Sequence, residues 1–280
     1  MAKVVSLVNM KGGVGKSTIT ANIAWHYSAY TNWAKKVLVA DLDPQFNVSQ
    51  YLLGINGYEE KVFAPNSPTM WDIFEQYSRT PGSGSKKIEP SDVIKKIITF
   101  RNGSKIDLIP SRLELAFSLK NPAQKELLLK DFLSKVDSEY DLILIDCPPT
   151  ESLLTTSAYL CSDYVLVPVK PEFLSTVGLP LLAQSLSDFN GQYQRMLKIA
   201  GIVFNGTTNY SPEEVKSKAE VNQIAVNNNW YVFNNSIRSS KSYPKGAREG
   251  KPIFWTSYAR TEVASEFRGF ATELAQRIGI

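Results

Sequence analysis

The chain has 280 residues, of which 43% are hydrophobic and 21% are charged, and its formal net charge is +4. This length can bury a substantial core and lies near the upper limit for one α/β domain. So mild a basic excess does not by itself indicate nucleic acid. Two cysteines, Cys147 and Cys161, are too few for a disulfide framework, and no apolar run is long enough to span a membrane. We therefore expect a soluble, intracellular protein that has reduced thiols and no signal peptide.

The N-terminal stretch Val4–Thr18 has the order of elements that a phosphate-binding loop requires. The β-branched run Val4–Val8 predicts a buried strand, and Thr18–Tyr30 predicts a helix. Glycines between them let successive N–H groups point at one anion, beside the positive end of the helix dipole. Lys16 would reach the β- and γ-phosphates, and Ser17 would offer its hydroxyl to Mg²⁺. The expected phosphate-binding residues are Gly12, Gly13, Val14, Gly15, Lys16, Ser17 and Thr18.

A second lysine, Lys11, precedes the first glycine, so that the motif reads K-G-G-V-G-K-S. Because the loop curls away from Lys11, we expect this lysine to act on a nucleotide held by another subunit. The signature resembles the deviant Walker A loop of the ParA/MinD family, in which the first lysine crosses an ATP-sandwiched dimer interface. The resemblance implies ATP as the nucleotide, a homodimer that forms with ATP, and a trans-acting Lys11 that stabilises the γ-phosphate as an arginine finger does.

The next apolar run, Lys36–Asp41, predicts a second buried strand that ends in the sequence D-L-D-P-Q-F-N-V-S. Carboxylates at the carboxyl end of a strand lie where open α/β sheets bind ligands. This segment resembles switch I of the ParA family. The resemblance implies that Asp43, the aspartate before the proline, orients the attacking water, and that Asp41 supports the Mg²⁺ shell.

The middle of the chain has weaker patterns. Trp71–Tyr77 predicts a short helix, residues 78–91 a flexible loop, and Pro90 the start of another helix. Ile106–Ile109 predicts a strand. Asn121–Val136 has apolar residues at helical spacing and should pack on the sheet.

Asp141–Asp146 (DLILID) is the clearest candidate for a central strand, and it ends in D-C-P-P. An apolar strand that ends in aspartate is the Walker B arrangement, in which Asp146 would hold a Mg²⁺-bound water. The D-x-P-P sequence resembles switch II of the same family, where a rigid proline pair could couple γ-phosphate loss to movement of the next helix. A strand at Tyr164–Pro168 and a helix to about Asn190 follow, and the sequence PEFLSTVGL between them also resembles ParA.

Ile199–Phe204 predicts another strand, which Asn205 follows. In MinD-type relatives an asparagine at the matching place contacts adenine through its amide, but asparagine is equally a good turn residue, and both readings stay open. Pro212–Asn229 predicts a helix and Trp230–Ile237 a strand. Relatives place a proline after that strand where this chain has Arg238, which leaves the base pocket undefined.

Basic residues gather between Ile237 and Arg260, where Glu249 is the single acidic residue. Such a run is the footprint of sequence-independent phosphate binding, although a solvated helix face that binds nothing has the same composition. The resemblance favours DNA, because ParA dimers use basic residues near here, and relatives often have Glu-Ala where this chain has Lys245-Gly246. The expected DNA contacts are Arg238, Lys241, Lys245, Arg248 and Lys251. No helix-turn-helix precedes the loop, so the expected partner is non-specific double-stranded DNA.

The C-terminal stretch Ala259–Ile278 predicts a helix with one narrow apolar face. MinD relatives end in a lysine-rich helix that binds membranes. Here acidic and basic residues balance and no basic tail follows, so we expect a helix that covers the core and no membrane partner. Trp25 and His26 are expected to be packing residues.

Taken together, these patterns predict a doubly wound α/β fold, with a mostly parallel sheet of about seven strands and helices on both faces, in one domain that spans residues 1–280. The resemblance covers essentially the whole chain. It implies a ParA/Soj-type partition ATPase whose ATP-bound dimer binds DNA and whose slow, Mg²⁺-dependent hydrolysis is stimulated by a ParB-like partner. Such a protein would be cytoplasmic and nucleoid-associated, and its cargo would be a plasmid, a chromosome or a protein assembly.

Two other classes of function remain open. A MinD-like ATPase that cycles on membranes would need a lipid-binding tail. A metabolic P-loop enzyme, such as a ligase or a nitrogenase-reductase relative, would need substrate or cluster ligands, and Cys147 and Cys161 lack the setting of a cluster site.

Overall fold

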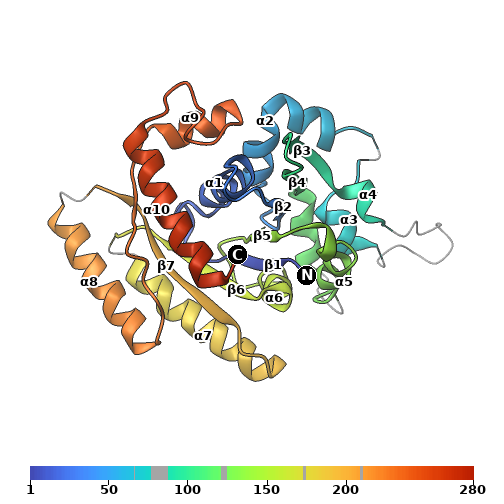
Figure 1. Cartoon of the computed structure of the whole chain (residues 1–280). Helices are drawn as coiled ribbons and strands as arrows, with labels where there is room; N and C mark the ends of the chain where they lie inside the picture. The colour runs from blue at the N-terminus through green and yellow to red at the C-terminus, as the bar shows by residue number, and fades with distance from the viewer. Residues whose placement is uncertain (66, 77–87, 121–124, 173–174, 209–210) are drawn as a thin grey trace.

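The central strands are buried on both faces, so the sheet requires hydrophobic cover on both sides. In β5 (Leu142–Asp146), Leu142 and Leu144 pack into one apolar cluster, whereas Ile143 and Ile145 pack into another, and all four are fully buried. The computed structural model describes residues 1–65, 67–76, 88–120, 125–172, 175–208 and 211–280. Figure 1 shows the resulting layers, with the sheet between two groups of helices.

The described residues form one eight-stranded sheet with the strand order β3-β4-β2-β5-β1-β6-β7-β8. Only the edge pair β3–β4 is antiparallel among the strand pairs of the described residues. The predicted fold class is thereby confirmed. The other strands are β1 (Lys3–Leu7), β2 (Lys36–Asp41), β3 (Lys95–Thr99), β4 (Lys105–Ile109), β6 (Tyr164–Val169), β7 (Lys198–Thr207) and β8 (Ile237–Arg238).

Helices cover both faces of this sheet. One hydrophobic cluster joins the sheet to α1, α2 and α10, and the other joins it to α3, α5, α6, α7 and α8. The helices are α1 (Lys16–Ala29), α2 (Asn47–Val62), α3 (Met70–Glu75), α4 (Pro90–Val93), α5 (Leu128–Ser134), α6 (Leu153–Cys161), α7 (Ser175–Tyr193), α8 (Pro212–Asn227), α9 (Ser242–Glu249) and α10 (Thr261–Ile278), with 3₁₀ turns at Leu113–Lys120 and Asp137–Glu139.

The strands differ from the prediction at two places. The helix predicted to begin at Pro90 is present as α4, but it ends at Val93, and β-branched residues then form β3, a strand that was not predicted. The strand predicted over Trp230–Ile237 is observed only as the two-residue strand β8. The backbone N–H groups of Asn234 and Asn235 donate to the Glu273 carboxylate, at 2.8 and 3.1 Å, instead of to a neighbouring strand.

Some helix boundaries also differ from the prediction. The helix predicted from residue 121 begins at Leu128, and residues 121–124 and 78–87 of the predicted elements lie outside the described part of the chain. No element was predicted for residues 47–62, which form α2. Gly54 interrupts this helix with φ 70° and ψ 166°, so the apolar spacing does not continue through it.

The C-terminal helix α10 covers the core as predicted. Its apolar residues Val263, Phe267, Phe270, Leu274 and Ile278 are all 3% exposed or less. Among the helices of the described residues, none combines the length and hydrophobicity that crossing a membrane would take.

The predicted packing role of Trp25 and His26 is confirmed, because they are only 6% and 1% exposed. Burial lowers the pKa of His26 to about 4, helped by the nearby charge of Arg268, so the imidazole is neutral at pH 7.

Candidate active site

The parallel strands β1, β2 and β5 end at the same edge of the sheet, and their registers place three loops together there. Leu7 pairs with Asp146, and Asp146 pairs on its other side with Asp41. The glycine loop, the segment around Asp43 and the segment after Asp146 therefore converge. This is the position at which open α/β sheets bind their ligands.

The glycine loop has the conformation that its sequence predicts. Gly13 and Gly15 have φ values of 75° and 92°, which favour glycine, and α1 begins at Lys16 directly after them. A Cβ atom on Gly15 would lie 2.2 Å from Nδ2 of Asn205, so a side chain would not fit there. The predicted order of strand, glycine loop and helix is confirmed.

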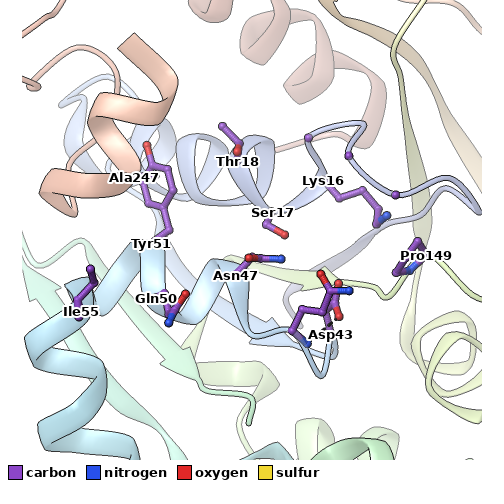
Figure 2. A pocket seen from close by; sticks show the side chains of 14 residues that line it. Lys16, Ser17, Thr18, Asp43, Asn47, Gln50, Tyr51, Ile55, Pro149 and Ala247 are labelled. Carbon is purple, nitrogen blue, oxygen red and sulfur yellow. Dashed lines mark hydrogen bonds between the residues drawn. The ribbon is translucent and has the colours of Figure 1, made fainter. Parts of the chain in front are cut away.

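A cavity of about 490 Å³ opens above the first turn of α1. The glycine loop, Lys16, Ser17 and Asp43 form one part of its wall, and α2 and α9 form the opposite part (Figure 2). A cavity of this size is within the range of small-molecule and cofactor sites. The segment after β5 contributes Pro149.

Lys16 points into the loop and is only 6% exposed. Its ammonium donates to the carbonyl oxygens of Asn9 and Lys11, at 3.2 and 3.4 Å. Burial lowers the pKa of Lys16, while the Asp146 carboxylate opposes this shift. Both partners in these hydrogen bonds are neutral, so a phosphate oxygen would be a stronger acceptor for this ammonium.

Asn9 was missed by the sequence analysis, although it shapes this loop. Its side chain, 3% exposed, donates to the carbonyl of Pro168 at 2.7 Å and accepts the backbone N–H of Lys11 at 2.8 Å. An asparagine directly after an apolar strand and before a glycine loop was the available signal.

Asp146 lies in the floor of the site with 0% exposure, and neither of its carboxylate oxygens has a hydrogen-bond partner of ordinary geometry among the described residues. Burial raises the pKa of Asp146 to about 7, against smaller opposing effects of the Ser17 hydroxyl and Lys16. A buried carboxylate without partners is strongly disfavoured unless a cation compensates it. The orphaned oxygens beside Ser17 therefore fit a hard cation such as Mg²⁺.

Asp41 is buried equally, but its oxygens are occupied. One oxygen accepts the backbone N–H of Asp43 at 3.1 Å, and the other accepts both the N–H and the hydroxyl of Ser49, at 3.0 and 2.6 Å. Burial and the neighbouring Asp146 raise the pKa of Asp41. This geometry makes Asp41 the anchor of the segment that leads into α2, and it leaves Asp41 fewer free lone pairs for a cation than Asp146.

Asp43 lines the cavity and is 6% exposed. Its Oδ1 accepts the backbone N–H of Gln45 at 2.9 Å, which fixes the carboxylate toward the glycine loop. Burial raises the pKa of Asp43, and Lys16 opposes this shift. The carboxylate is therefore placed to accept a hydrogen bond from a water in the cavity.

Lys11 forms an ion pair within its own chain. Its ammonium lies 3.0 Å from a carboxylate oxygen of Glu172, which also pairs with Lys170. These contacts lower the pKa of Glu172. Glu172 was not predicted as a site residue, because 161 residues separate it from Lys11 and no local pattern indicates this contact.

Asn205, for which contact with adenine and a turn both stayed open, and Arg238, a predicted DNA contact at the place of a proline in relatives, both have protein partners. The Asn205 amide donates to the carbonyl of Val14 at 2.7 Å, which holds the glycine loop against β7. Arg238 pairs with Glu266 and Glu262 of α10, with a donor–acceptor distance of 2.7 Å from Nε to Glu266. These glutamates offset the charge of Arg238.

The remaining basic residues lie on and beside α9. Lys241, Arg248 and Lys251 are exposed, and Lys245 is half-buried, with its ammonium 3.2 Å from Glu249. Positions 241, 245 and 248 share one face of a helix by their spacing. The face is thus mostly solvated and basic.

The chain resembles known proteins over its whole length. A family model described as an AAA domain, AAA_31, matches residues 2–199. The chromosome-partitioning ATPase Soj of Treponema pallidum is 30% identical over 284 residues, which cover 100% of this chain and 99% of that protein. The sporulation initiation inhibitor protein Soj of Bacillus subtilis is 32% identical over 206 residues, or 72% of each chain. The solved structure of Cyanothece apo McdA superposes with a TM-score of 0.80 at 21% identity, covering 98% of this chain and 100% of that one. The chain therefore belongs to the AAA_31 domain family and, within it, to the ParA/Soj-type ATPases.

Proposed function

We propose that this protein is a Mg²⁺-dependent ATPase that dimerises with ATP, binds double-stranded DNA without sequence preference, and uses hydrolysis to position or partition a cargo. The observation that carries the proposal is that Lys16, Ser17 and Asp43 line one cavity together with the glycine loop. The fully buried Asp146, whose oxygens lack a hydrogen bond of ordinary geometry among the described residues, lies close to Lys16 and Ser17. The Treponema relative is described as a chromosome-partitioning ATPase, which supports a function in partition for this chain.

The chain's own residues would bind ATP as follows. Backbone N–H groups of residues 12–18 and the Lys16 ammonium would hold the phosphates, with Asn205 beside the base. Ser17 and Asp146 would hold Mg²⁺, and Asp41 would keep the neighbouring segment in place. When bound, the ion would neutralise charge on the β- and γ-phosphate oxygens.

Asp43 would orient the water that attacks the γ-phosphate. Its carboxylate is fixed by the Gln45 N–H and faces the cavity that the glycine loop lines. Positioning contributes most of the catalysis in phosphoryl transfer, so a single misplaced carboxylate would slow the reaction strongly.

Lys11 would act on the nucleotide of a second copy. In the single chain its ammonium is held by Glu172, so formation of the dimer would require this ion pair to break. The low activity expected of the isolated protein follows, because one chain alone does not present Lys11 to its own γ-phosphate. A ParB-like activator would act on this dimer.

The exposed basic face of α9 would contact DNA phosphates. Lys241, Lys245 and Arg248 lie on one helix face, and Lys251 follows the helix; Arg238 contributes less because two glutamates already pair with it. The buried apolar face of α10 supports DNA over a membrane as the partner. A cytoplasmic protein that binds DNA in this way would be associated with the nucleoid.

The ATPase part of the proposal is tested with Asp43→Asn. We expect ATP binding to stay within about three-fold of the wild type while turnover falls on the order of 100-fold, because the variant keeps the shape of the side chain but loses the acceptor charge. Unchanged turnover in the variant would contradict the assignment. Ser134→Ala, far from the cavity at the end of α5, is the control.

A further inference from the structure

Helix α9, which carries the basic face, packs on α2, and the segment directly after it is held by a buried hydrogen-bond node formed by Tyr51, Asn22 and the backbone of Lys251 and Ile253. Figure 1 shows the two helices side by side. Tyr51 of α2, 4% exposed, donates its hydroxyl hydrogen to the carbonyl of Lys251 at 3.0 Å. Asn22 of α1 is fully buried; its amide nitrogen donates to the Tyr51 hydroxyl at 3.1 Å, and its amide oxygen accepts the N–H of Ile253 at 3.0 Å.

The node explains why position 246 is glycine in this chain. A Cβ atom on Gly246 would lie 2.7 Å from the Tyr51 hydroxyl and 2.6 Å from the carbonyl oxygen of Lys251, and both distances are shorter than real Cβ contacts. Gly250 then ends α9 in the left-handed conformation, with φ 63°. The tyrosine and the glycine therefore form a matched pair that lets the two helices approach closely.

The same node borders the nucleotide cavity. Tyr51 and Ala247 of α9 line one side of this cavity, opposite the glycine loop (Figure 2). Helix α2 is in turn tied to the catalytic edge of the sheet, because the N–H and hydroxyl of Ser49 donate to Asp41. A ligand that moves either wall would therefore change the contacts of Tyr51.

We propose that Tyr51, together with Asn22, is a positioning residue that makes the placement of the basic segment, residues 241–251, depend on the nucleotide in the cavity. The proposal rests on the proposed function of that cavity. Coupling between two sites requires contacts that differ between the states, and the node is shared by the nucleotide-binding helix α1, by α2 and by the basic segment. Each buried hydrogen bond that differs between the two states can change the ratio of the DNA affinities by about five-fold.

The test compares the wild type with Tyr51→Phe, which keeps the buried ring and removes only the hydroxyl. Affinity for a random-sequence duplex is measured with a non-hydrolysable ATP analogue and with ADP. We expect the ratio of the two affinities to fall by about 5- to 25-fold in the variant, which corresponds to the loss of one or two hydrogen bonds. Because Tyr51 lines the cavity, both affinities are measured at saturating nucleotide.

The second readout does not need DNA. The amide of Ile253 donates to Asn22, so hydrogen exchange of residues 246–253 reports on the node directly. We expect the ATP analogue to change exchange in this segment in the wild type and to change it much less in Tyr51→Phe. If the wild type binds no DNA with either nucleotide, the DNA proposal fails, and the exchange comparison still decides the coupling.

Tyr27→Phe is the matched control. Tyr27 is a fully buried tyrosine of α1 whose hydroxyl donates to the carbonyl of Ala271 at 2.6 Å, so the variant loses the same kind of bond, but to α10. We expect it to keep the wild-type affinity ratio and exchange response. A Tyr51→Phe protein with wild-type coupling, or an equal loss in Tyr27→Phe, would overturn the proposal.

Discussion

Asp41 and Asp146 lie opposite each other at the ends of β2 and β5, but their hydrogen bonding differs completely. Asp41 accepts three hydrogen bonds from Asp43 and Ser49, whereas Asp146 has no partner of ordinary geometry in the described part of the chain. Two identical residues at equal depth therefore have different surroundings. Asp41 holds the loop that carries Asp43, and we propose that Asp146 binds the cation.

The burial of Asp146 predicts that, without nucleotide and Mg²⁺, the stability of the protein depends on pH. The pKa of Asp146 is about 7 in the folded protein and 3.8 when unfolded, so the folded state binds more protons between these values. The free energy of unfolding should therefore fall as pH rises from about 4 to 7. Asp146→Asn does not titrate and should flatten this decline. Denaturant unfolding at several pH values measures both proteins, and parallel pH profiles would contradict the assignment.

The ion pair between Lys11 and Glu172 predicts that Glu172 opposes dimer formation. Glu172→Gln should tighten the proposed ATP-dependent dimer, by at most about five-fold, because the side chains are 21% and 45% exposed and such pairs contribute about 1 kcal/mol or less. Sedimentation with an ATP analogue gives the dimer affinity. Glu114→Gln removes a similarly exposed pair, with Arg112, and is the control. A dimer weakened by Glu172→Gln would mean that this carboxylate supports the interface instead.

Two glycine-to-alanine substitutions in the glycine loop should differ in their effect on stability. Gly15→Ala places a Cβ 2.2 Å from the Asn205 amide at φ 92°, so it should lower the free energy of unfolding by about 1–3 kcal/mol. Gly12→Ala finds no atom within 4 Å and should change stability by less than about 0.5 kcal/mol. Denaturant unfolding compares them, and equal stabilities would show that the loop relaxes around the new side chain.

Because α10 covers the core, truncation of its buried residue Phe270 should lower the stability of the protein strongly. Phe270 is fully buried and packs edge-to-face on Phe233 and Phe267, so Phe270→Ala should destabilise the protein by about 3–5 kcal/mol. Val226→Ala, at a side chain that is 74% exposed, should change stability little. If Phe270→Ala were neutral for stability but reduced binding to lipid vesicles, a membrane-binding α10 would replace the covering helix.

Most of the fold was predictable because its signals are local. The strand, glycine loop and helix around Lys16 lie between residues 3 and 29, and the apolar strand that ends in Asp146 is five residues long. The two edges of the sheet could not be predicted from local patterns. At one edge, β3 is an antiparallel strand that follows a four-residue helix. At the other edge, the N–H groups of Asn234 and Asn235, just before β8, donate to Glu273.

The long-range contacts of the site could not be read from the sequence. Lys11 meets Glu172 across 161 residues, and Tyr51 meets Lys251 across 200. Gly246 was visible only as a departure from the Glu-Ala of relatives. Its cause, the Tyr51 hydroxyl that occupies the space of a side chain, depends on how α2 and α9 pack.

The most direct test of the whole account is the binding of a random-sequence DNA duplex in the presence of ATP and of ADP, for the wild type and a Lys241→Ala/Lys245→Ala/Arg248→Ala variant. We predict that the wild type binds the duplex tightly with ATP and does not bind it with ADP. This binding should weaken steeply as the salt concentration rises. The variant should bind more weakly, and the slope of the logarithm of its affinity against the logarithm of the salt concentration should be smaller by about three. Absence of binding by the wild type in both nucleotide states, or binding that the variant retains, would contradict this prediction.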